Sequence, residues 1–183
     1  LTKQNPNIKL IQVQHHYAHI LATMGINNIT SKVLGVSFDG TGYGDDNKLW
    51  GGEFFICDNN SYKRVNHFNY FKLLGGTLAI KEPRRIALSF LFDIYGKDAL
   101  DMSNNTINSF SKTELKTLYT LWEKNINSPL TSSCGRLFDL VASLLNIVQI
   151  SSYEGESGLL LESYYDSSIT NYFEFDINDQ IID

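Results

Sequence analysis

The apolar positions of the chain first follow a helical spacing and then alternate as they do in strands. In residues 12–25 they recur every three or four positions up to a glycine, which is typical of a helix that ends in a C-cap. Residues 32–38 and 49–57 are rich in β-branched and aromatic side chains, and the glycine-rich stretch 39–44 between them is typical of a turn. The pattern therefore predicts one helix followed by a β-hairpin.

The pattern becomes helical after the glycine pair at positions 75 and 76. Before it, residues 62–71 alternate as a third strand that returns alongside the hairpin. Pro83 precedes a helical pattern at 84–95, where its missing N–H costs nothing because the first turn has no partner for it. Further segments predict three more helices and a final strand, in residues 112–125, 135–145, 156–165 and 173–177. The expected fold is α/β, with an N-terminal hairpin sheet followed by helices.

Composition and charge narrow the class of protein. The chain has 183 residues, 43% of them hydrophobic and 19% charged, which indicates one soluble globular domain. Its net charge of −5, without a run of Lys or Arg, disfavours nucleic acid as a partner. No apolar run approaches the roughly 20 residues that a membrane span needs, and Leu1–Ile11 is too polar for a signal peptide.

The two cysteines indicate a reducing compartment. Cys57 and Cys134 lie far apart and form neither a disulfide framework nor a CxxC metal motif, so we expect free thiols in a cytoplasmic protein. The chain begins at Leu1 without an initiator Met, and its last predicted strand stops close to the end. We therefore expect a piece of a longer polypeptide.

Three of the four histidines lie within five residues. His15 and His19 are four positions apart, so both rings project from one face of a helix and could grip a divalent metal. A third ligand must come from elsewhere, and Asp39 is the obvious candidate. A polar helix face with packed or solvated histidines explains the spacing equally well. His16 is expected to point elsewhere as a structural residue, and the isolated His67 to be a satisfied or surface histidine.

Two glycine-bearing segments face one another in the predicted hairpin. One is the stretch 39–44, with three glycines after a strand, and the other is Gly51 with Gly52 on the partner strand. Exposed backbone N–H groups there could bind phosphate oxygens. The pattern is neither a P-loop nor a dinucleotide fingerprint, and an ordinary glycine-rich hairpin explains it equally well.

Two later segments could form walls of a ligand pocket. Residues 132–139 place hydroxyls and a glycine before a helix whose first turn carries Asp139, which could accept hydrogen bonds from ribose hydroxyls. A serine N-cap with an acidic residue countering the helix dipole explains the same residues. Residues 153–157 supply a second glycine-containing turn before a helix. The basic residues at the helix start, 81–85, are explained as part of a solvated surface.

Taken in order, these segments resemble a known family. The motifs VQHHYAH, FDGTGYG, LWGGEF, KEPRR, TSSCGRLFD and YEGES are similar to the carboxy-terminal catalytic part of the HypF carbamoyltransferases of hydrogenase maturation, from about Ile11 to Glu162. The resemblance implies part of an actin/sugar kinase/Hsp70-like domain, also similar to the tRNA threonylcarbamoyladenosine transferases. Residues 1–183 would be a single partial catalytic domain that continues beyond Asp183.

The resemblance also implies an activity. Carbamoyl phosphate and ATP give carbamoyl-adenylate in this family, and the carbamoyl group passes to the C-terminal cysteine of the partner HypE for cyanide ligand synthesis. The rest of the polypeptide would form the adenylate, and this domain would use it. A bound cation would polarise the mixed anhydride, while glycine-rich N–H groups would stabilise the leaving AMP.

Site residues are carried over motif by motif. Asp39 and Gly40 would be catalytic, and the metal ligands would be His15, His19 and Asp39, holding zinc, iron or another divalent ion. The nucleotide and phosphate contacts would come from Gly40, Thr41, Gly42, Asp139 and Gly155. The expected partners are a HypE-like acceptor protein, adenine nucleotide and, through the rest of the protein, carbamoyl phosphate.

The sequence departs from the family in two ways. A further metal-binding Asp and part of the nucleotide pocket are expected beyond Asp183, and Glu156 and Ser157 stand where the family usually has Gln and Ala. The alternatives are a small-molecule O-carbamoyltransferase, a tRNA threonylcarbamoyl transferase, and a non-catalytic nucleotide-binding or partner-docking module. The tRNA enzymes would show Ser-Gly-Gly where this chain has Asp39-Gly-Thr.

Overall fold

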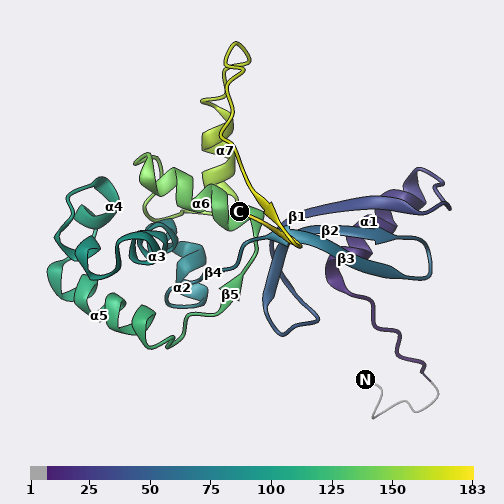
Figure 1. The fold of residues 1–183 in the computed structure, drawn as a ribbon, viewed down its shortest axis with the longest axis horizontal. Helices are drawn as coiled ribbons and strands as arrows, with labels where there is room; N and C mark the ends of the chain where they lie inside the picture. The colour runs from purple at the N-terminus through teal and green to yellow at the C-terminus, as the bar shows by residue number, and fades with distance from the viewer. Residues whose placement is uncertain (1–7) are drawn as a thin grey trace.

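A curved sheet and a group of helices lie side by side in the structure, a computed structural model that describes residues 8–183. Figure 1 shows α1 against one face of the long strands, the helices from α2 to α6 gathered beyond one end of the sheet, and α7 projecting from that group. The expectation for Leu1–Ile11 falls mostly outside the described residues. Within 8–183, no helix has the length and apolar character to cross a bilayer.

The order of elements follows the predicted succession of hairpin sheet and helices. In chain order they are α1 (His15–Ile26), β1 (Val33–Tyr43), β2 (Leu49–Cys57), β3 (Tyr62–Phe68), β4 (Phe71–Lys72), α2 (Thr77–Lys81), α3 (Pro83–Tyr95), the 3-10 helix η1 (Gly96–Asp101), α4 (Asn105–Asn108), α5 (Lys112–Glu123), β5 (Leu130–Thr131), α6 (Cys134–Leu144), α7 (Glu156–Glu162), β6 (Ile177–Asn178) and β7 (Ile181–Ile182). The α/β class is confirmed.

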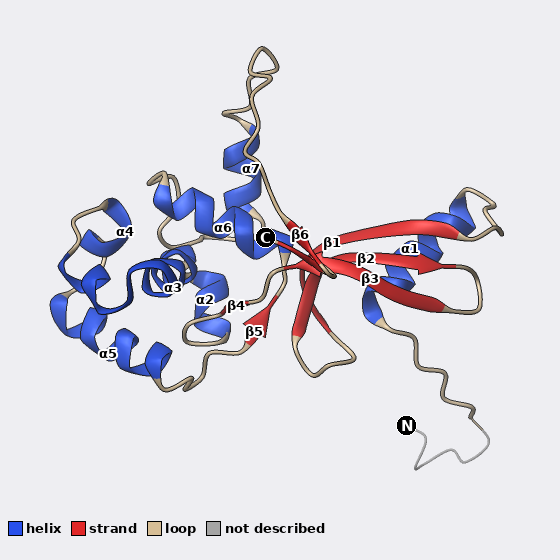
Figure 2. Ribbon diagram, in the orientation of Figure 1, coloured by secondary structure: helices blue, strands red, loops and turns tan. Residues whose placement is uncertain are grey.

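The sheet is built around the predicted hairpin. β1 pairs antiparallel with β2, and β2 pairs antiparallel with β3, both as the sequence indicated. Short strands extend it: β5 runs parallel to β2, and β7 runs parallel to β3. Figure 2 shows β4 and β5 where the sheet meets the helical group. β5 is the strand that leads into α6, so this pairing brings the start of α6 to the hairpin.

The alternation of β1 decides which of its side chains meet α1. Gly35 faces the helix, and a Cβ there would lie 2.5 Å from Cδ1 of Ile20, so the missing side chain allows the helix to approach closely. Ser37 is buried on the same side, whereas Leu34 and Val36 are exposed on the other. With a period of two, the next residue on the α1 side is Asp39.

Two predicted boundaries, the start of α1 and the turn of the hairpin, were wrong. Helix α1 begins at His15 rather than at position 12, because Gln14 has an extended backbone and its side chain accepts a hydrogen bond from the Tyr17 N–H as an N-cap. The stretch 39–44 is not the turn. β1 continues to Tyr43, and the reversal follows where the Gly44 N–H donates to the Lys48 carbonyl.

The glycine-rich stretch is a bulge within the strand. Phe38 pairs with Gly52 and Gly42 pairs with Trp50, so residues 39–41 lie opposite Gly51 alone. A bulge of this kind bends the strand and re-aims the side chains it carries. The glycines of this stretch led to the prediction of a turn. In the structure they leave room for neighbouring groups beside the bulged strand.

Several predicted boundaries later in the chain also differ from those of the structure. The third strand ends at Phe68, and β4 is separate because it pairs with β5 instead of β2. The short helices α2 and α4 and the turn η1 carry too little periodicity to be predicted. Of residues 173–177 only Ile177 lies in a strand. The helices predicted near α3, α5, α6 and α7 are confirmed, with ends that differ by at most three residues.

The buried apolar side chains form separate clusters that hold these parts together. One lies between α1 and the hairpin and contains Tyr17, Ile20, Met24, Trp50, Phe55 and Cys57. A second fills the helical group around Phe92, and a third joins β4 to α2 and α3 through Phe71 and Ile86. The first cluster fixes α1 against the sheet, which sets the position of the histidines. Cys57 and Cys134 are free thiols.

Candidate metal and nucleotide site

The predicted histidine pair meets Asp39 at the N-terminal end of α1. Nε2 of His15 lies 2.9 Å from Oδ2 of Asp39, and Nε2 of His19 lies 3.5 Å from the same oxygen. The two Nε2 atoms are 3.2 Å apart. Both rings are about half exposed. The helix and the bulged strand thus bring three donor atoms to one point at the surface.

The spacing of these donors fits a divalent ion. With metal–ligand distances of about 2.0–2.2 Å, two ligands of a tetrahedral site lie about 3.3–3.6 Å apart. The three separations here run from 2.9 to 3.5 Å, so small side-chain shifts would suffice. Two imidazoles and a carboxylate are also the donor set of many zinc and iron sites.

Asp39 is held in its charged form. Burial alone would raise its pKa, but hydrogen bonds from His15 and from the backbone N–H groups of Gly40 and Thr41 outweigh that effect and lower the pKa. The Gly40 N–H lies 2.6 Å from Oδ1. Oδ1 is therefore occupied by the backbone, and Oδ2 is directed to the histidines.

His16 also lies at this site, which corrects the prediction that it points elsewhere. It is completely buried, and its Nε2 lies 3.9 Å from Oδ2 of Asp39. The candidate ligand atoms of His15, His16 and Asp39 all lie within 4.8 Å of one another. Burial lowers the pKa of His16. Sequence spacing missed it because adjacent helix positions usually diverge, whereas here the bulge places Asp39 beside both.

Gly42 provides the space for the imidazoles. A Cβ at Gly42 would lie 2.5 Å from Cε1 of His16 and 2.6 Å from Cδ2 of His15. Its backbone does not require a positive φ. The glycine is therefore needed for close approach rather than for conformational freedom.

The bulge itself is fixed by the start of α6. The Ser133 hydroxyl donates toward the carbonyl of Asp39 at 2.7 Å and that of Gly40 at 2.9 Å, and it also accepts from the Arg136 N–H as the helix N-cap. Across the hairpin, a Cβ at Gly51 would lie 2.6 Å from the Asp39 carbonyl oxygen. The predicted serine N-cap is thus confirmed, and it also holds the strand that carries Asp39. The prediction that Asp139 lies in the first turn of this helix is wrong, because α6 begins at Cys134 and its first turn carries no acidic residue.

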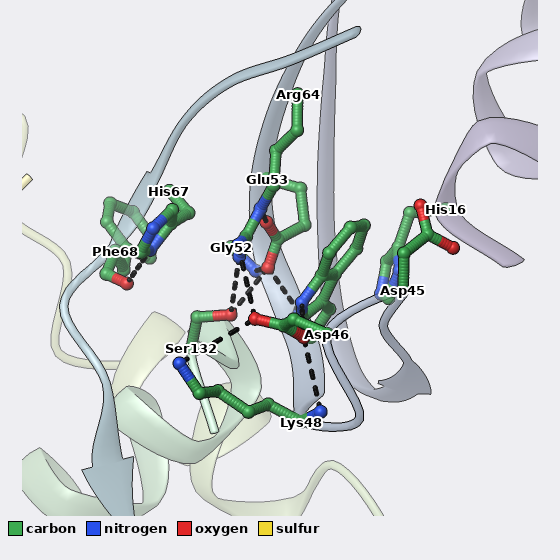
Figure 3. A network of polar contacts seen from close by, with 12 residues as sticks. His16, Asp45, Asp46, Lys48, Gly52, Glu53, Arg64, His67, Phe68 and Ser132 are labelled. Carbon is green, nitrogen blue, oxygen red and sulfur yellow. Dashed lines mark hydrogen bonds and ion pairs between the residues drawn. The ribbon is translucent and has the colours of Figure 1, made fainter. Parts of the chain in front are cut away.

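A buried carboxylate that the sequence analysis did not identify supports this contact. Glu53 is fully buried and accepts hydrogen bonds from the N–H groups of Gly51 and Gly52 at 3.0 and 3.2 Å. It also accepts from the Ser132 hydroxyl at 2.5 Å and pairs with Nε of Arg64 at 2.6 Å. Figure 3 shows the network, with Arg64 and Ser132 meeting Glu53 from different sides.

Arg64 ties this network to the hairpin loop. Its guanidinium stacks over the Trp50 ring at 4.0 Å and donates to the Tyr70 hydroxyl at 2.9 Å. Tyr70 in turn donates to Asp46 at 2.6 Å. Glu53 gave only a weak signal in the sequence, its position directly after Gly51 and Gly52, because a single Glu in a strand is typical of a surface residue.

His67 is buried with its Nδ1 2.8 Å from the Phe68 carbonyl, and its satisfied character is confirmed.

Asp139 is buried on α6 and paired with Arg136. Nη1 of Arg136 lies 2.6 Å from Oδ2 of Asp139. Burial raises the pKa of Asp139, while the charge of Arg136 and the nearby Ser157 hydroxyl act in the opposite direction. Nη2 of Arg136 would lie 3.1 Å from a Cβ at Gly40. Arg136 therefore links Asp139 to the bulge, and it is a second residue that the sequence analysis missed.

Gly155 is the N-cap of α7. It is exposed and has a φ of 83°, a left-handed conformation that favours glycine. Ser157, two residues later, is buried beside α6. Thr41 lies exposed in the bulge. The structure thus groups the residues of the bulge with Asp139 through Arg136 and places Gly155 at the start of the neighbouring helix; their contacts with a nucleotide stay predictions.

The chain is similar to carbamoyltransferases over most of its length. Residues 35–183 match the family described as "Carbamoyltransferase, Kae1-like Domain, second subdomain". It is 38% identical to the carbamoyltransferase HypF of Synechocystis over 192 residues, which cover 97% of this chain and 25% of that protein. It is 39% identical to the probable carbamoyltransferase HypF of Methanocaldococcus jannaschii, covering 93% of this chain and 21% of that protein.

Solved structures agree with the sequence comparison. The crystal structure of a full-length HypF in a phosphate- and nucleotide-bound form superposes with a TM-score of 0.87 at 36% identity, covering 100% of this chain and 29% of that one. The chain thus spans about a quarter of the length of the relatives it matches.

Proposed function

The chain belongs to the HypF carbamoyltransferase family, and from this premise we propose that it is the part of a carbamoyltransferase that handles the activated carbamoyl group. The observation that carries the proposal is the convergence of His15, His19 and Asp39 within 3.5 Å of one another. The donor would be carbamoyl-adenylate and the acceptor the C-terminal cysteine of a HypE-like protein, as a step of cyanide ligand synthesis in hydrogenase maturation.

The three donor atoms would hold a divalent ion, which when bound acts as a Lewis acid toward an oxygen of the mixed anhydride. The role of the chain is to hold those donors in place. As long as no metal is bound, hydrogen bonds from His15 and the Gly40 backbone keep Asp39 charged. Because Oδ1 is fixed by Gly40, only Oδ2 turns toward the histidines, which restricts the carboxylate to one ligating oxygen.

The adenylate would lie between the bulge and the starts of α6 and α7. Gly40, Thr41 and Gly42 would line its phosphate and carbamoyl side, and Asp139 and Gly155 its ribose and adenine side. Arg136 supports this arrangement because its guanidinium lies beside Gly40 and carries positive charge toward a phosphate. A related full-length HypF has been solved in a phosphate- and nucleotide-bound form, which supports nucleotide binding in the family.

No nucleophile from this chain is needed, because the acceptor cysteine would attack the carbamoyl carbon and AMP would leave with the bonding electron pair. The adenylate itself would be formed from ATP and carbamoyl phosphate elsewhere in the full protein, since this chain spans about a quarter of its relatives. We place the protein in the cytoplasm, where its thiol acceptor stays reduced.

Metal content and nucleotide binding test the proposal together. Wild type is compared with His15→Ala/His19→Ala and with the control Thr23→Ala, an exposed change one turn further along α1. We expect about one zinc or iron per chain by elemental analysis in wild type and control and none in the double variant. Calorimetry with a non-hydrolysable carbamoyl-adenylate analogue should then show binding that depends on the metal. Equal metal content in all three proteins would refute the assignment.

A further inference from the structure

His16 is a buried imidazole whose role none of the contacts above explains. Its side chain is fully buried, and within residues 8–183 its Nε2 has no hydrogen-bond partner. That atom faces Oδ2 of Asp39 at 3.9 Å. An unpaired polar atom in the core is costly, and an apolar side chain could fill the same space without that cost. The imidazole therefore calls for a function that uses Nε2.

Gln14 determines which nitrogen of His16 carries the hydrogen. Its Oε1 accepts from the Tyr17 N–H at 2.9 Å, so its amide nitrogen is the atom that donates to the Tyr43 carbonyl at 2.9 Å and lies 3.3 Å from Nδ1 of His16. Nδ1 is then an acceptor, and in the neutral ring the hydrogen lies on Nε2. A protonated Nε2 cannot bind a metal, but it can donate a hydrogen bond to a carboxylate.

We propose that His16 is a positioning residue that donates a hydrogen bond from Nε2 to Asp39 and so orients this carboxylate toward the metal. The inference rests on the metal centre proposed above. In the structure the Oδ2 atom contacts Nε2 of His15 at 2.9 Å. When Nε2 of His15 and His19 bind a metal, they no longer donate to Oδ2, and among the side chains that the structure describes His16 is then placed to donate to it.

The surroundings of His16 permit the small movement this requires. The gap of 3.9 Å must close by about 1 Å to give a normal N–H to oxygen distance. Gly42 leaves the space beside Cε1 of His16 free of a side chain. Oδ1 of Asp39 stays on the Gly40 N–H, so a rotation about that contact would bring Oδ2 toward the imidazole. Outer-shell donors of this kind typically change metal affinity 10- to 100-fold.

Two substitutions distinguish a donor from a ligand or a packing residue. His16→Gln keeps an N–H near the place of Nε2, whereas His16→Leu removes it at a similar volume. Zinc affinity is measured by competition with a chromophoric chelator, and the geometry of the centre by the visible absorption of the Co²⁺-loaded chain. Thr23→Ala serves as the control, and circular dichroism verifies folding.

We expect His16→Leu to weaken zinc binding about 10- to 100-fold and to shift the Co²⁺ spectrum, and His16→Gln to bind nearly as wild type does. If His16→Leu does not fold, His16→Met, which also lacks the N–H, takes its place in the comparison. Loss of affinity in His16→Gln, or unchanged affinity in a folded His16→Leu, overturns it. Zinc binding that survives in His15→Ala/His19→Ala refutes the metal centre instead, which separates the two failures.

Discussion

Replacement of Glu53 by Gln should be among the most destabilising single changes outside the apolar core. The carboxylate is fully buried and has four partners, at 2.5 to 3.2 Å. Gln keeps one acceptor oxygen for the Gly51 and Gly52 N–H groups and the Ser132 hydroxyl. Its amide nitrogen, however, would face Nε of Arg64, so the ion pair is lost and two donors oppose each other.

The size of this loss in unfolding free energy depends on the burial of Arg64. Removing one partner of a buried ion pair costs about 3–5 kcal/mol. The Arg64 side chain is 15% exposed and keeps its contacts with Tyr70 and Trp50, so we expect about 2–4 kcal/mol. For a chain of this size each kcal/mol lowers Tm by about 2–4 °C, which predicts a drop of about 4–16 °C.

Urea unfolding followed by circular dichroism measures the change in free energy. Glu154→Gln, an exposed substitution, should alter it by no more than about 0.5 kcal/mol. The double variant Glu53→Gln/Arg64→Met should lose less free energy of unfolding than the sum of the two single variants, because both single changes remove the same interaction. A cost below about 1 kcal/mol for Glu53→Gln would show that the buried carboxylate is not the anchor of this network.

Two further predictions concern the bulge and the start of α3. Gly42→Ala should displace both imidazoles and lower the metal content, because its Cβ would lie 2.5 Å from Cε1 of His16. The control Gly25→Ala, whose Cβ would lie in open space on α1, should keep the metal content of wild type. Elemental analysis measures the metal content of each variant. Glu82→Gln should cost about 1–2 kcal/mol at pH 7, since the carboxylate pairs with Arg84 and Arg85. Burial alone would raise the pKa of Glu82, but those pairs outweigh it and lower the pKa from 4.5. The stabilisation is therefore present above pH 4.5 and lost as the pH falls through the lowered value, so in urea unfolding the difference from wild type should shrink at acid pH. A difference that persists there would contradict this cause.

The proposed site shows how a bulge substitutes for a loop. Residues 39–41 are accommodated opposite Gly51 and held by Ser133 at the start of α6. Glu53 on β2 fixes the facing Gly51 through its backbone N–H. A site on a paired strand is more rigid than one on a free turn, since both neighbours restrain the backbone. This rigidity suits the role proposed for Asp39, whose carboxylate would present a single oxygen to a metal.

The sequence by itself determined the elements with strong local patterns and the pair of histidines. The spacing of His15 and His19 specifies one helix face in any fold, and the apolar alternation of the hairpin specifies which strands pair. Six ordered motifs were enough to identify the family, because each combines residue types with rare spacing. The serine cap of α6 likewise depends only on local geometry.

Only the tertiary structure decided what lies between these elements. The bulge at Asp39 depends on its pairing with β2, which glycine content alone cannot distinguish from a turn. The proximity of His16 to Asp39 depends on that bulge, and the importance of Glu53 and Arg136 depends on burial against residues far along the chain. A sequence pattern reports local preferences, whereas a site of this kind is assembled from long-range contacts whose register and distance no single segment encodes.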